Sequence, residues 1–402
     1  MSGKRPDFCR FPPQPVIKMH TNEKKNSIWK IEDVSGPWIE VDLDAVSHNI
    51  EQIGRFSGTK LMPVIKANAY GHGAVQVACH LEQMAPVHGL CVGVVREAIA
   101  LRECGVKIPL LNLGHYTKAE ANRIVALNIS QSVFTCAVAW LDQAAREQNR
   151  VAVVHIKIDT GLGRVGVPYH KAVGFIEQVA NMANVHIEGV FTSLSEDPDF
   201  DKIQMTRFHS TLRRAEAKGI SLGVKHAASS AAVLEYPESG LDMIRPGIMV
   251  FGHYPSSAER RLKRIDLKPA LTLKARVVYV KDMKAGDTIA YHRVYKAHGK
   301  ETIITGGIGY IDGYPTGLAG GGECLIGGTR HPLIAAVTAN HIYVRSRRDD
   351  IETGEEIVLY GKQGEEEIPL EEIVQLCEHS EYNLLARLSP SLPRFYLRPD
   401  IH

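Results

Sequence analysis

The segment Val64–Gly73 reads V-I-K-A-N-A-Y-G-H-G, and the rest of the chain can be interpreted outward from it. The apolar run L-M-P-V-I is typical of a buried strand, and the small residues and glycines after Lys66 are typical of a turn. In barrel folds the functional groups stand where strands end. A lysine there is costly to desolvate unless it reacts or is paired, and Schiff-base chemistry uses a desolvated amine. The alternative is a lysine that only reaches for solvent at a barrel rim.

From Trp38 to about residue 263, short apolar runs alternate with longer helical patterns. The runs L-M-P-V-I-K, H-G-L-C-V-G-V-V, P-L-L-N-L, V-V-H-I-K-I, I-E-G-V-F-T and M-I-R-P-G-I-M-V-F-G indicate strands. Helices are expected between them, at residues 44–54, 74–84, 96–104, 118–127 and 170–183. Repeated strand–helix units imply a parallel sheet, and their number suits an α/β fold with a closed, TIM-like (β/α)8 barrel. An open doubly wound sheet is the alternative.

Near Arg264 the pattern changes to short strands separated by turn signals, as in L-K-A-R-V-V-Y-V and T-I-I-T-G-G-I-G-Y. This predicts a C-terminal β-rich domain over residues 264–402, after a barrel domain over residues 36–263. Residues 1–35 carry many Lys, Asn and Pro and are predicted to form a poorly ordered arm. The glycine-rich stretch G-L-A-G-G-G-E indicates a turn, because it lacks the strand-to-helix setting of a phosphate loop.

Composition narrows the class of protein. A chain of 402 residues is long enough for two domains, and its shares of hydrophobic (44%) and charged (23%) residues are ordinary for a globular protein. Because 47 Lys and Arg nearly balance 45 Asp and Glu, we expect a small-molecule partner and neither nucleic acid nor membrane. The seven cysteines are scattered without C-x-x-C pairs, so we expect reduced thiols and no metal site. The N-terminus lacks the pattern of a secretory signal, which predicts a cytoplasmic location.

The motif around Lys66 resembles the pyridoxal-phosphate motif of alanine racemases, and other segments resemble that family in the same order. They are V-D-L-D-A from Val41, I-K-I-D-T-G-L-G-R-V-G from Ile156, L-D-M-I-R-P-G-I from Leu241, G-Y-I-D-G-Y-P from Gly309 and L-S-P-S-L-P-R from Leu388. The resemblance covers nearly everything after the arm. It implies pyridoxal 5'-phosphate on the motif lysine, an amino acid as substrate, and a homodimer with active sites shared across the interface. The usual family role is to supply D-alanine for cell-wall synthesis.

The resemblance implies two acid/base groups, Lys66 on one face of the substrate α-carbon and Tyr291 on the other. Without it, Tyr291 would be interpreted as an aromatic residue packing a sheet. Bound pyridoxal phosphate delocalises the charge left by the α-proton, so two positioned groups suffice for racemisation. Arg245 matches the family arginine at the pyridine nitrogen. A fold-related decarboxylase should place an acid there, so Arg245 argues against that class.

Further residues match family positions around the cofactor and the substrate. Phosphate binding is implied for Ser230, Gly247, Ile248, Tyr70 and Tyr382. Arg164 matches an arginine near the phenolic oxygen and the substrate carboxylate, and Lys157 matches a lysine that is carbamylated in many members. Tyr310 resembles a tyrosine at the site entrance, and the backbone N–H of Ala339 is expected to bind the substrate carboxylate.

Three short segments depart from the family pattern. T-S at residues 192–193 stands where the family commonly has T-H, S-S at 229–230 where it has N-S, and A-N-H at 339–341 where it has M-D-Q. The departures lie near the expected substrate position, so a racemase for serine or larger amino acids is an alternative to an alanine racemase. A non-catalytic paralogue that binds pyridoxal phosphate is an alternative of another class.

Overall fold

The computed structural model describes residues 30–397. Its N-terminal part is a barrel of parallel strands in the order β2-β10-β9-β8-β6-β5-β4-β3, with β7 attached to β6. Bridges between Leu61 and Val87 and between Val64 and Cys91 join β2 to β3 and close the ring. The strands are β2 (Lys60–Leu61), β3 (Leu90–Val92), β4 (Leu110–Asn112), β5 (Ser130–Val133), β6 (Ala152–Asp159), β7 (Val167–Pro168), β8 (Val185–Phe191), β9 (Val224–His226) and β10 (Met243–Ile244).

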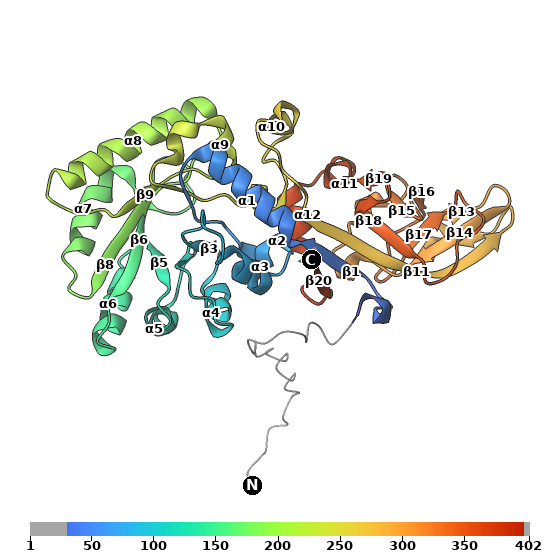
Figure 1. Ribbon diagram of the computed structural model, residues 1–402, viewed down its shortest axis with the longest axis horizontal. Helices are drawn as coiled ribbons and strands as arrows, with labels where there is room; N and C mark the ends of the chain where they lie inside the picture. The colour runs from blue at the N-terminus through green and yellow to red at the C-terminus, as the bar shows by residue number, and fades with distance from the viewer. Residues whose placement is uncertain (1–29, 398–402) are drawn as a thin grey trace, which may run out of the picture.

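Helices surround this barrel (Figure 1). They are α1 (Leu43–Ser57), α2 (Lys66–Tyr70), α3 (Ala74–Leu81), α4 (Val95–Glu103), α5 (Lys118–Ala126), α6 (Val138–Glu147), α7 (Tyr169–Ala180), α8 (Pro198–Glu216), α9 (Ser230–Glu235) and α10 (Ser257–Leu262). Each predicted helix is present with ends shifted by a few residues. The largest extension is in α1, which continues past Gly54 and ends at Gly58 in the left-handed conformation.

The C-terminal part is built on an antiparallel sheet in the order β19-β18-β15-β16-β17-β14-β11-β1-β20, with a further pairing of β18 to β11. Its strands are β11 (Leu271–Met283), β14 (Glu301–Gly306), β15 (Glu323–Ile326), β16 (Thr329–Ile334), β17 (Ile342–Arg345), β18 (Glu356–Gln363), β19 (Glu366–Ile368) and β20 (Arg394–Leu397). The short hairpin of β12 (Thr288–Ile289) and β13 (Tyr295–Lys296) forms its own sheet, and α11 (Leu370–Cys377) and α12 (Glu381–Arg387) precede β20. The predicted barrel and β-rich domain are confirmed, and the open doubly wound sheet is wrong.

The strand β1 (Trp38–Asp42) comes before the barrel in sequence but belongs to the sheet of the β-domain. It pairs antiparallel with β11 and parallel with β20. A single short strand carries no local signal for the sheet that it joins. The predicted limits of the two domains stay a prediction.

The predicted arm over residues 1–35 lies mostly outside the described residues. Its last residues, from Lys30 on, include a short 3-10 turn at Ile31–Asp33. Arg276 of β11 donates hydrogen bonds to the carbonyls of Val34 (2.9 Å) and Ile31 (2.9 Å), so this part is fastened to the β-domain. Within residues 30–397, no helix is long and apolar enough to cross a membrane, and all cysteines are free.

Candidate active site

Lys66 lies after β2, at the C-terminal mouth of the barrel, and begins an unusual turn. The next four residues all have positive φ angles: Ala67 (53°), Asn68 (55°), Ala69 (54°) and Tyr70 (49°). Non-glycine residues avoid this left-handed region, and each costs roughly 1–2 kcal/mol there. A turn of this kind persists only where its surroundings hold it. The turn after Lys66 is therefore a strained segment that other parts of the chain must stabilise.

Glu97 on α4 provides one clamp for this turn. Its carboxylate accepts hydrogen bonds from the backbone N–H groups of Ala67 (2.7 Å), Gly93 (2.9 Å) and Val94 (3.3 Å). Within the turn, the side chain of Asn68 accepts from the N–H of Ala74 (2.8 Å) and thereby joins the turn to the start of α3. The loop after β3 and the turn after β2 are thus held by one carboxylate.

The end of the chain provides a second clamp. Arg394 donates to the carbonyl of Gly71 (2.7 Å), and the Tyr396 hydroxyl donates to the carbonyl of His72 (3.1 Å). Gly73 makes this approach possible, because a β-carbon there would overlap the Tyr396 hydroxyl at 1.9 Å. Arg394, at the end of the L-S-P-S-L-P-R segment, and Tyr396 just beyond it therefore support the turn that follows Lys66.

Four cations gather at the barrel mouth: Lys66, Lys157, Arg164 and Arg245. Burial, and then the charge of Arg164, lower the pKa of Lys66, although its side chain is exposed at the mouth of the single chain. Burial, followed by Arg164 and Arg245, lowers the pKa of Lys157 to about 8. Within residues 30–397, none of the four makes an ion pair with a carboxylate. A cluster of unpaired positive charges is suited to an anionic ligand.

A second group of site residues forms a small cradle beside Lys66. The N–H of Gly247 donates to the hydroxyl of Ser230 (2.9 Å), where the short helix α9 begins. The Tyr70 ring lies against that of Tyr382, with centroids 6.0 Å apart. A β-carbon at Gly247 would lie 2.9 Å from the Tyr70 hydroxyl. With Ile248 following Gly247 in a 3-10 turn, two helix starts meet here, and such starts bind phosphate.

Arg245 is almost fully buried and firmly held. One end of its guanidinium donates to the carbonyls of Thr192 (2.8 Å) and Ala227 (2.9 Å), and the other contacts the Nδ1 atom of His226 at 2.5 Å. The guanidinium also lies over the ring of Phe191, 5.0 Å from its centroid. Its permanent charge is thus fixed in the barrel interior.

Two of the predicted residues of the β-domain, Tyr291 and Tyr310, lie on its surface. Tyr291 lies in the turn between β12 and β13 and is 80% exposed. Tyr310 is 53% exposed, and its N–H donates to the carbonyl of Thr338, next to Ala339, at 3.0 Å. Tyr310 and Ala339 are therefore neighbours.

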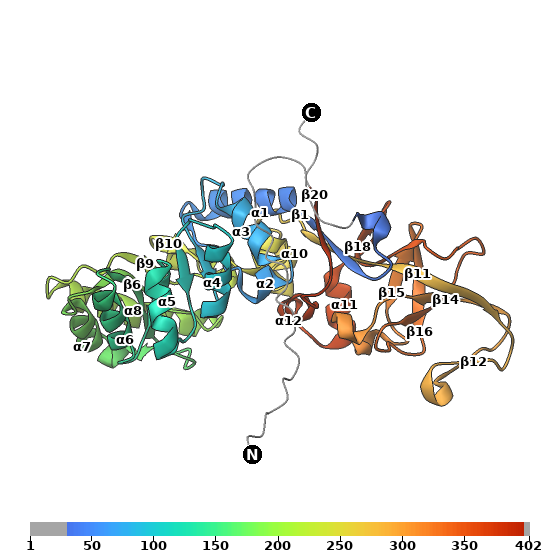
Figure 2. The same ribbon diagram turned by 90° about the horizontal axis from the view of Figure 1, so that it is seen from below.

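The hairpin with Tyr291 does not reach the barrel of its own chain. Figure 2 shows β12 at the end of the β-domain away from α2, and Figure 1 shows β13 toward the same end. One subunit thus brings together the predicted barrel residues and Tyr382, but not Tyr291.

Residues that sequence reasoning missed also shape the site. Glu97 directly contacts the turn after Lys66, and His226 directly contacts Arg245. Glu97 follows the strand pattern H-G-L-C-V-G-V-V closely, but no local signal indicates that its carboxylate points toward a different strand end.

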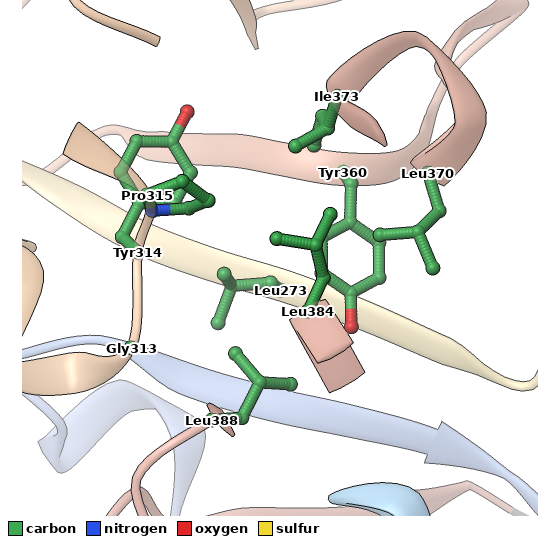
Figure 3. A pocket seen from close by; sticks show the side chains of 9 residues that line it. All are labelled: Leu273, Gly313, Tyr314, Pro315, Tyr360, Leu370, Ile373, Leu384 and Leu388. Atoms are coloured by element: carbon green, nitrogen blue, oxygen red, sulfur yellow. The ribbon is translucent and has the colours of Figure 1, made fainter. Parts of the chain in front are cut away.

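A small cavity in the β-domain is unrelated to this site. Its lining is mainly apolar, with Leu273, Leu370 and Leu384 around the Tyr360 ring (Figure 3). The Tyr360 hydroxyl is buried and has no hydrogen-bond partner among the described residues. The cavity has no charged group in its lining, so it does not resemble the cationic barrel mouth.

Comparisons with known proteins agree with this geometry. The family model for the alanine racemase N-terminal domain matches residues 41–255, and that for the alanine racemase C-terminal domain matches residues 270–396. The chain is 38% identical over 367 residues to an alanine racemase of Carboxydothermus hydrogenoformans, which covers 90% of this chain and 99% of the relative. It is 38% identical over 379 residues to alanine racemase 2 of Bacillus subtilis, covering 90% and 94%.

Solved structures give the same result. An alanine racemase from Clostridium difficile 630 has a TM-score of 0.85 at 31% identity, covering 90% of this chain and 96% of that one. The alanine racemase from Bacillus anthracis with bound L-Ala-P has a TM-score of 0.84 at 30% identity, covering 91% and 96%. The family models span most of both domains, and the relatives match at nearly full length. This chain therefore belongs to the alanine racemase family.

Proposed function

We propose that the protein interconverts L-alanine and D-alanine with pyridoxal 5'-phosphate held at Lys66. The observation that carries the proposal is the position of Lys66, on a strained turn at the mouth of a barrel of this family, among cations that lack carboxylate partners. The cradle at Gly247 supports the cofactor, because an added β-carbon would fill the space beside the Tyr70 hydroxyl. When bound, pyridoxal phosphate stabilises the negative charge that remains after an α-proton leaves.

Each barrel residue has a physical task in this proposal. The lowered pKa of Lys66 leaves more of its amine neutral near pH 7, which suits a group that would hold the cofactor and accept a proton from the substrate. Ser230, Gly247, Ile248, Tyr70 and Tyr382 bind the phosphate. Arg245 would hold the pyridine nitrogen of the cofactor with a charge that cannot supply a proton readily, and Arg164 would bind the substrate carboxylate and the phenolic oxygen of the cofactor.

The second acid/base group, Tyr291, comes from the partner subunit of a homodimer. Two observations support this: its 80% exposure, and the distance of its hairpin from α2 in both views of the chain. The exposed apolar side chain of Val294, in the same turn as Tyr291, is suited to an interface. Tyr310 and Ala339 accompany Tyr291 and complete the substrate pocket of the other subunit.

Lys157 is carbamylated in this proposal. Its amine would stand unpaired and buried beside Arg164 and Arg245, and a pKa of about 8 leaves part of it neutral and able to attack carbon dioxide. The nitrogen–carbon bond forms as one proton is released, and the product carries a negative charge. Repulsion toward Arg164 then becomes attraction. The predicted cytoplasmic location and role in D-alanine supply belong to the same proposal.

The test is α-proton exchange and inversion in deuterated water, with the cofactor-loaded protein and L-alanine, L-serine and longer L-amino acids. We expect exchange with inversion for L-alanine, with loss of activity in Lys66→Ala and Tyr291→Phe and no loss in Tyr279→Phe, which changes another exposed tyrosine of the β-domain. Exchange confined to serine or longer side chains would point to the segments 192–193 and 339–341 as specificity determinants. Cofactor binding without any exchange would favour the non-catalytic paralogue.

Mixing the two inactive variants tests the shared site. In a mixed dimer of Lys66→Ala and Tyr291→Phe subunits, one of the two sites keeps both intact residues. Random exchange of subunits should therefore restore activity to about a quarter of that of the unaltered protein. If both groups acted within one chain, mixing would restore nothing.

A further inference from the structure

A line of polar side chains crosses the interior of the barrel, beginning at Arg245. The Nη1 atom of Arg245 contacts His226 Nδ1, and His226 Nε2 lies 2.8 Å from His155 Nδ1. His155 Nε2 lies 3.0 Å from Glu188 Oε2, which also accepts a hydrogen bond from the Ser130 hydroxyl at 2.8 Å. Both histidines are fully buried. Among residues 30–397, this line of hydrogen bonds joins Arg245 to the carboxylate of Glu188.

The line runs from the mouth of the barrel toward its opposite end. Arg245 follows the end of β10, and His226 is the last residue of β9. His155 lies midway along β6, paired with Gly189 of β8, and Glu188 comes just before that glycine. The Glu188 side chain is 39% exposed, so the line ends at solvent on the side away from Lys66.

Hydrogen-bond chemistry sets the direction of the whole line. A guanidinium has only donors, so His226 Nδ1 must accept, and the one proton of this neutral ring lies on Nε2. That proton points at His155 Nδ1, which must therefore accept in turn. The proton of His155 is left on Nε2 and is donated to Glu188. The donor at the Arg245 end and the acceptor at the Glu188 end thus fit the same tautomers of the two histidines.

The surrounding charges agree with this direction. Burial, and then the charge of Arg245, hold the pKa of His226 well below its usual value, so the ring stays a neutral acceptor. The hydrogen bond from His155 lowers the pKa of Glu188, so the far end is a carboxylate. Arg245 makes no ion pair among residues 30–397, and its hydrogen bonds lead through the two rings to the Glu188 carboxylate.

The fold also leaves room for this arrangement. A β-carbon on Gly189 would lie 2.5 Å from His155 Nδ1 and 2.7 Å from its Cε1 atom. Any larger residue would push the imidazole off the line. The ring of His226 is fixed by stacking on Phe191, with centroids 4.9 Å apart and planes 4° from parallel.

We infer that Glu188 and His155 are positioning residues, which keep His226 as a hydrogen-bond acceptor and thereby hold Arg245 in place at the barrel mouth. The inference rests on the proposed role of Arg245 at the cofactor and adds to it two residues that touch neither cofactor nor substrate. Without the carboxylate, His155 loses the acceptor for its Nε2 proton. The proton of each ring can then move from Nε2 to Nδ1. A His226 ring protonated at Nδ1 would present a donor to the Arg245 guanidinium, which is itself a donor.

The test reads the tautomers directly, in both the cofactor-free and the cofactor-loaded protein. Ring 15N NMR of histidine-labelled protein distinguishes Nδ1 from Nε2 protonation, and His155→Gln and His226→Gln assign the signals. We expect both rings to be neutral and protonated at Nε2. Glu188→Ala should lose this single state, while Glu188→Gln, whose amide oxygen still accepts, should restore it. Finding either ring protonated at Nδ1 in the unaltered protein would overturn the inference.

Kinetics provide the second measurement. We expect kcat/KM to fall roughly tenfold in Glu188→Ala and by less than about threefold in Glu188→Gln, the usual scale for losing or weakening one hydrogen bond. The control is Glu216→Gln, which changes a carboxylate of similar exposure paired with Lys225 and should leave kcat/KM unchanged. Should Glu188→Ala not fold, the unaltered protein and Glu188→Gln still decide the question by NMR. The tautomers do not depend on turnover, so an inactive protein with the expected tautomers contradicts only the proposed function.

Discussion

Glu97 offers a direct test of how the turn after Lys66 is held. Glu97→Ala removes the acceptor of three backbone N–H groups, those of Ala67, Gly93 and Val94. Two of these bonds are exposed, so solvent replaces part of what is lost, and we expect the free energy of unfolding to fall by about 2 kcal/mol. The four left-handed residues then lose one of their clamps, and the affinity for pyridoxal phosphate should fall about tenfold.

The measurements are urea unfolding of the cofactor-free protein and a binding titration with pyridoxal phosphate. The matched control is Glu120→Ala. Glu120 holds the same third position in α5 and accepts from the N–H (2.8 Å) and hydroxyl (2.9 Å) of Thr117, far from the turn. We expect Glu120→Ala to lower the free energy of unfolding by about 1 kcal/mol and to leave the affinity for pyridoxal phosphate unchanged. If Glu97→Ala were no more harmful than Glu120→Ala in both measurements, the clamp would be refuted.

Three further outcomes are expected. Gly247→Ala should weaken cofactor binding without unfolding the protein, because its β-carbon would lie 2.9 Å from the Tyr70 hydroxyl; an unchanged dissociation constant would contradict the cradle. In carbonate-free buffer at pH 7, Lys157→Met should have a higher free energy of unfolding than the unaltered protein, because unfolding raises the pKa of Lys157 from about 8 toward 10.5 and the unfolded lysine binds more protons. The difference in free energy of unfolding between the two proteins should narrow as the pH rises between these values. A difference that does not change with pH in urea unfolding would argue against the buried amine. Tyr360→Phe removes a buried hydroxyl without a described partner and should leave the melting temperature unchanged or higher, whereas Tyr254→Phe, whose hydroxyl donates to a backbone carbonyl, should lower it.

The sequence was sufficient for those parts of the site that depend on local pattern. Lys66 could be placed at a strand end because an apolar run stops there and a glycine-containing turn begins. The barrel followed from the repetition of such units. Signals of this kind lie within a few residues of the feature that they predict.

Other parts of the site depend on contacts between distant segments. Arg394 and Tyr396 support a turn more than 300 positions earlier in the chain, and nothing near them in sequence indicates it. The sheet that β1 joins depends likewise on β11 and β20, which lie far along the chain.

By itself, therefore, the sequence determined the two-part architecture, the family and the candidate cofactor lysine, because periodicity and motifs are properties of neighbouring residues. Only the tertiary structure decided that four cations share the barrel mouth, that Tyr291 lies away from Lys66 of its own chain, and that Arg245 is connected to Glu188. These features arise where the barrel closes and strands distant in sequence meet. The physical reason is that charge and hydrogen bonding act through space, whereas a sequence pattern reports only what is adjacent along the chain.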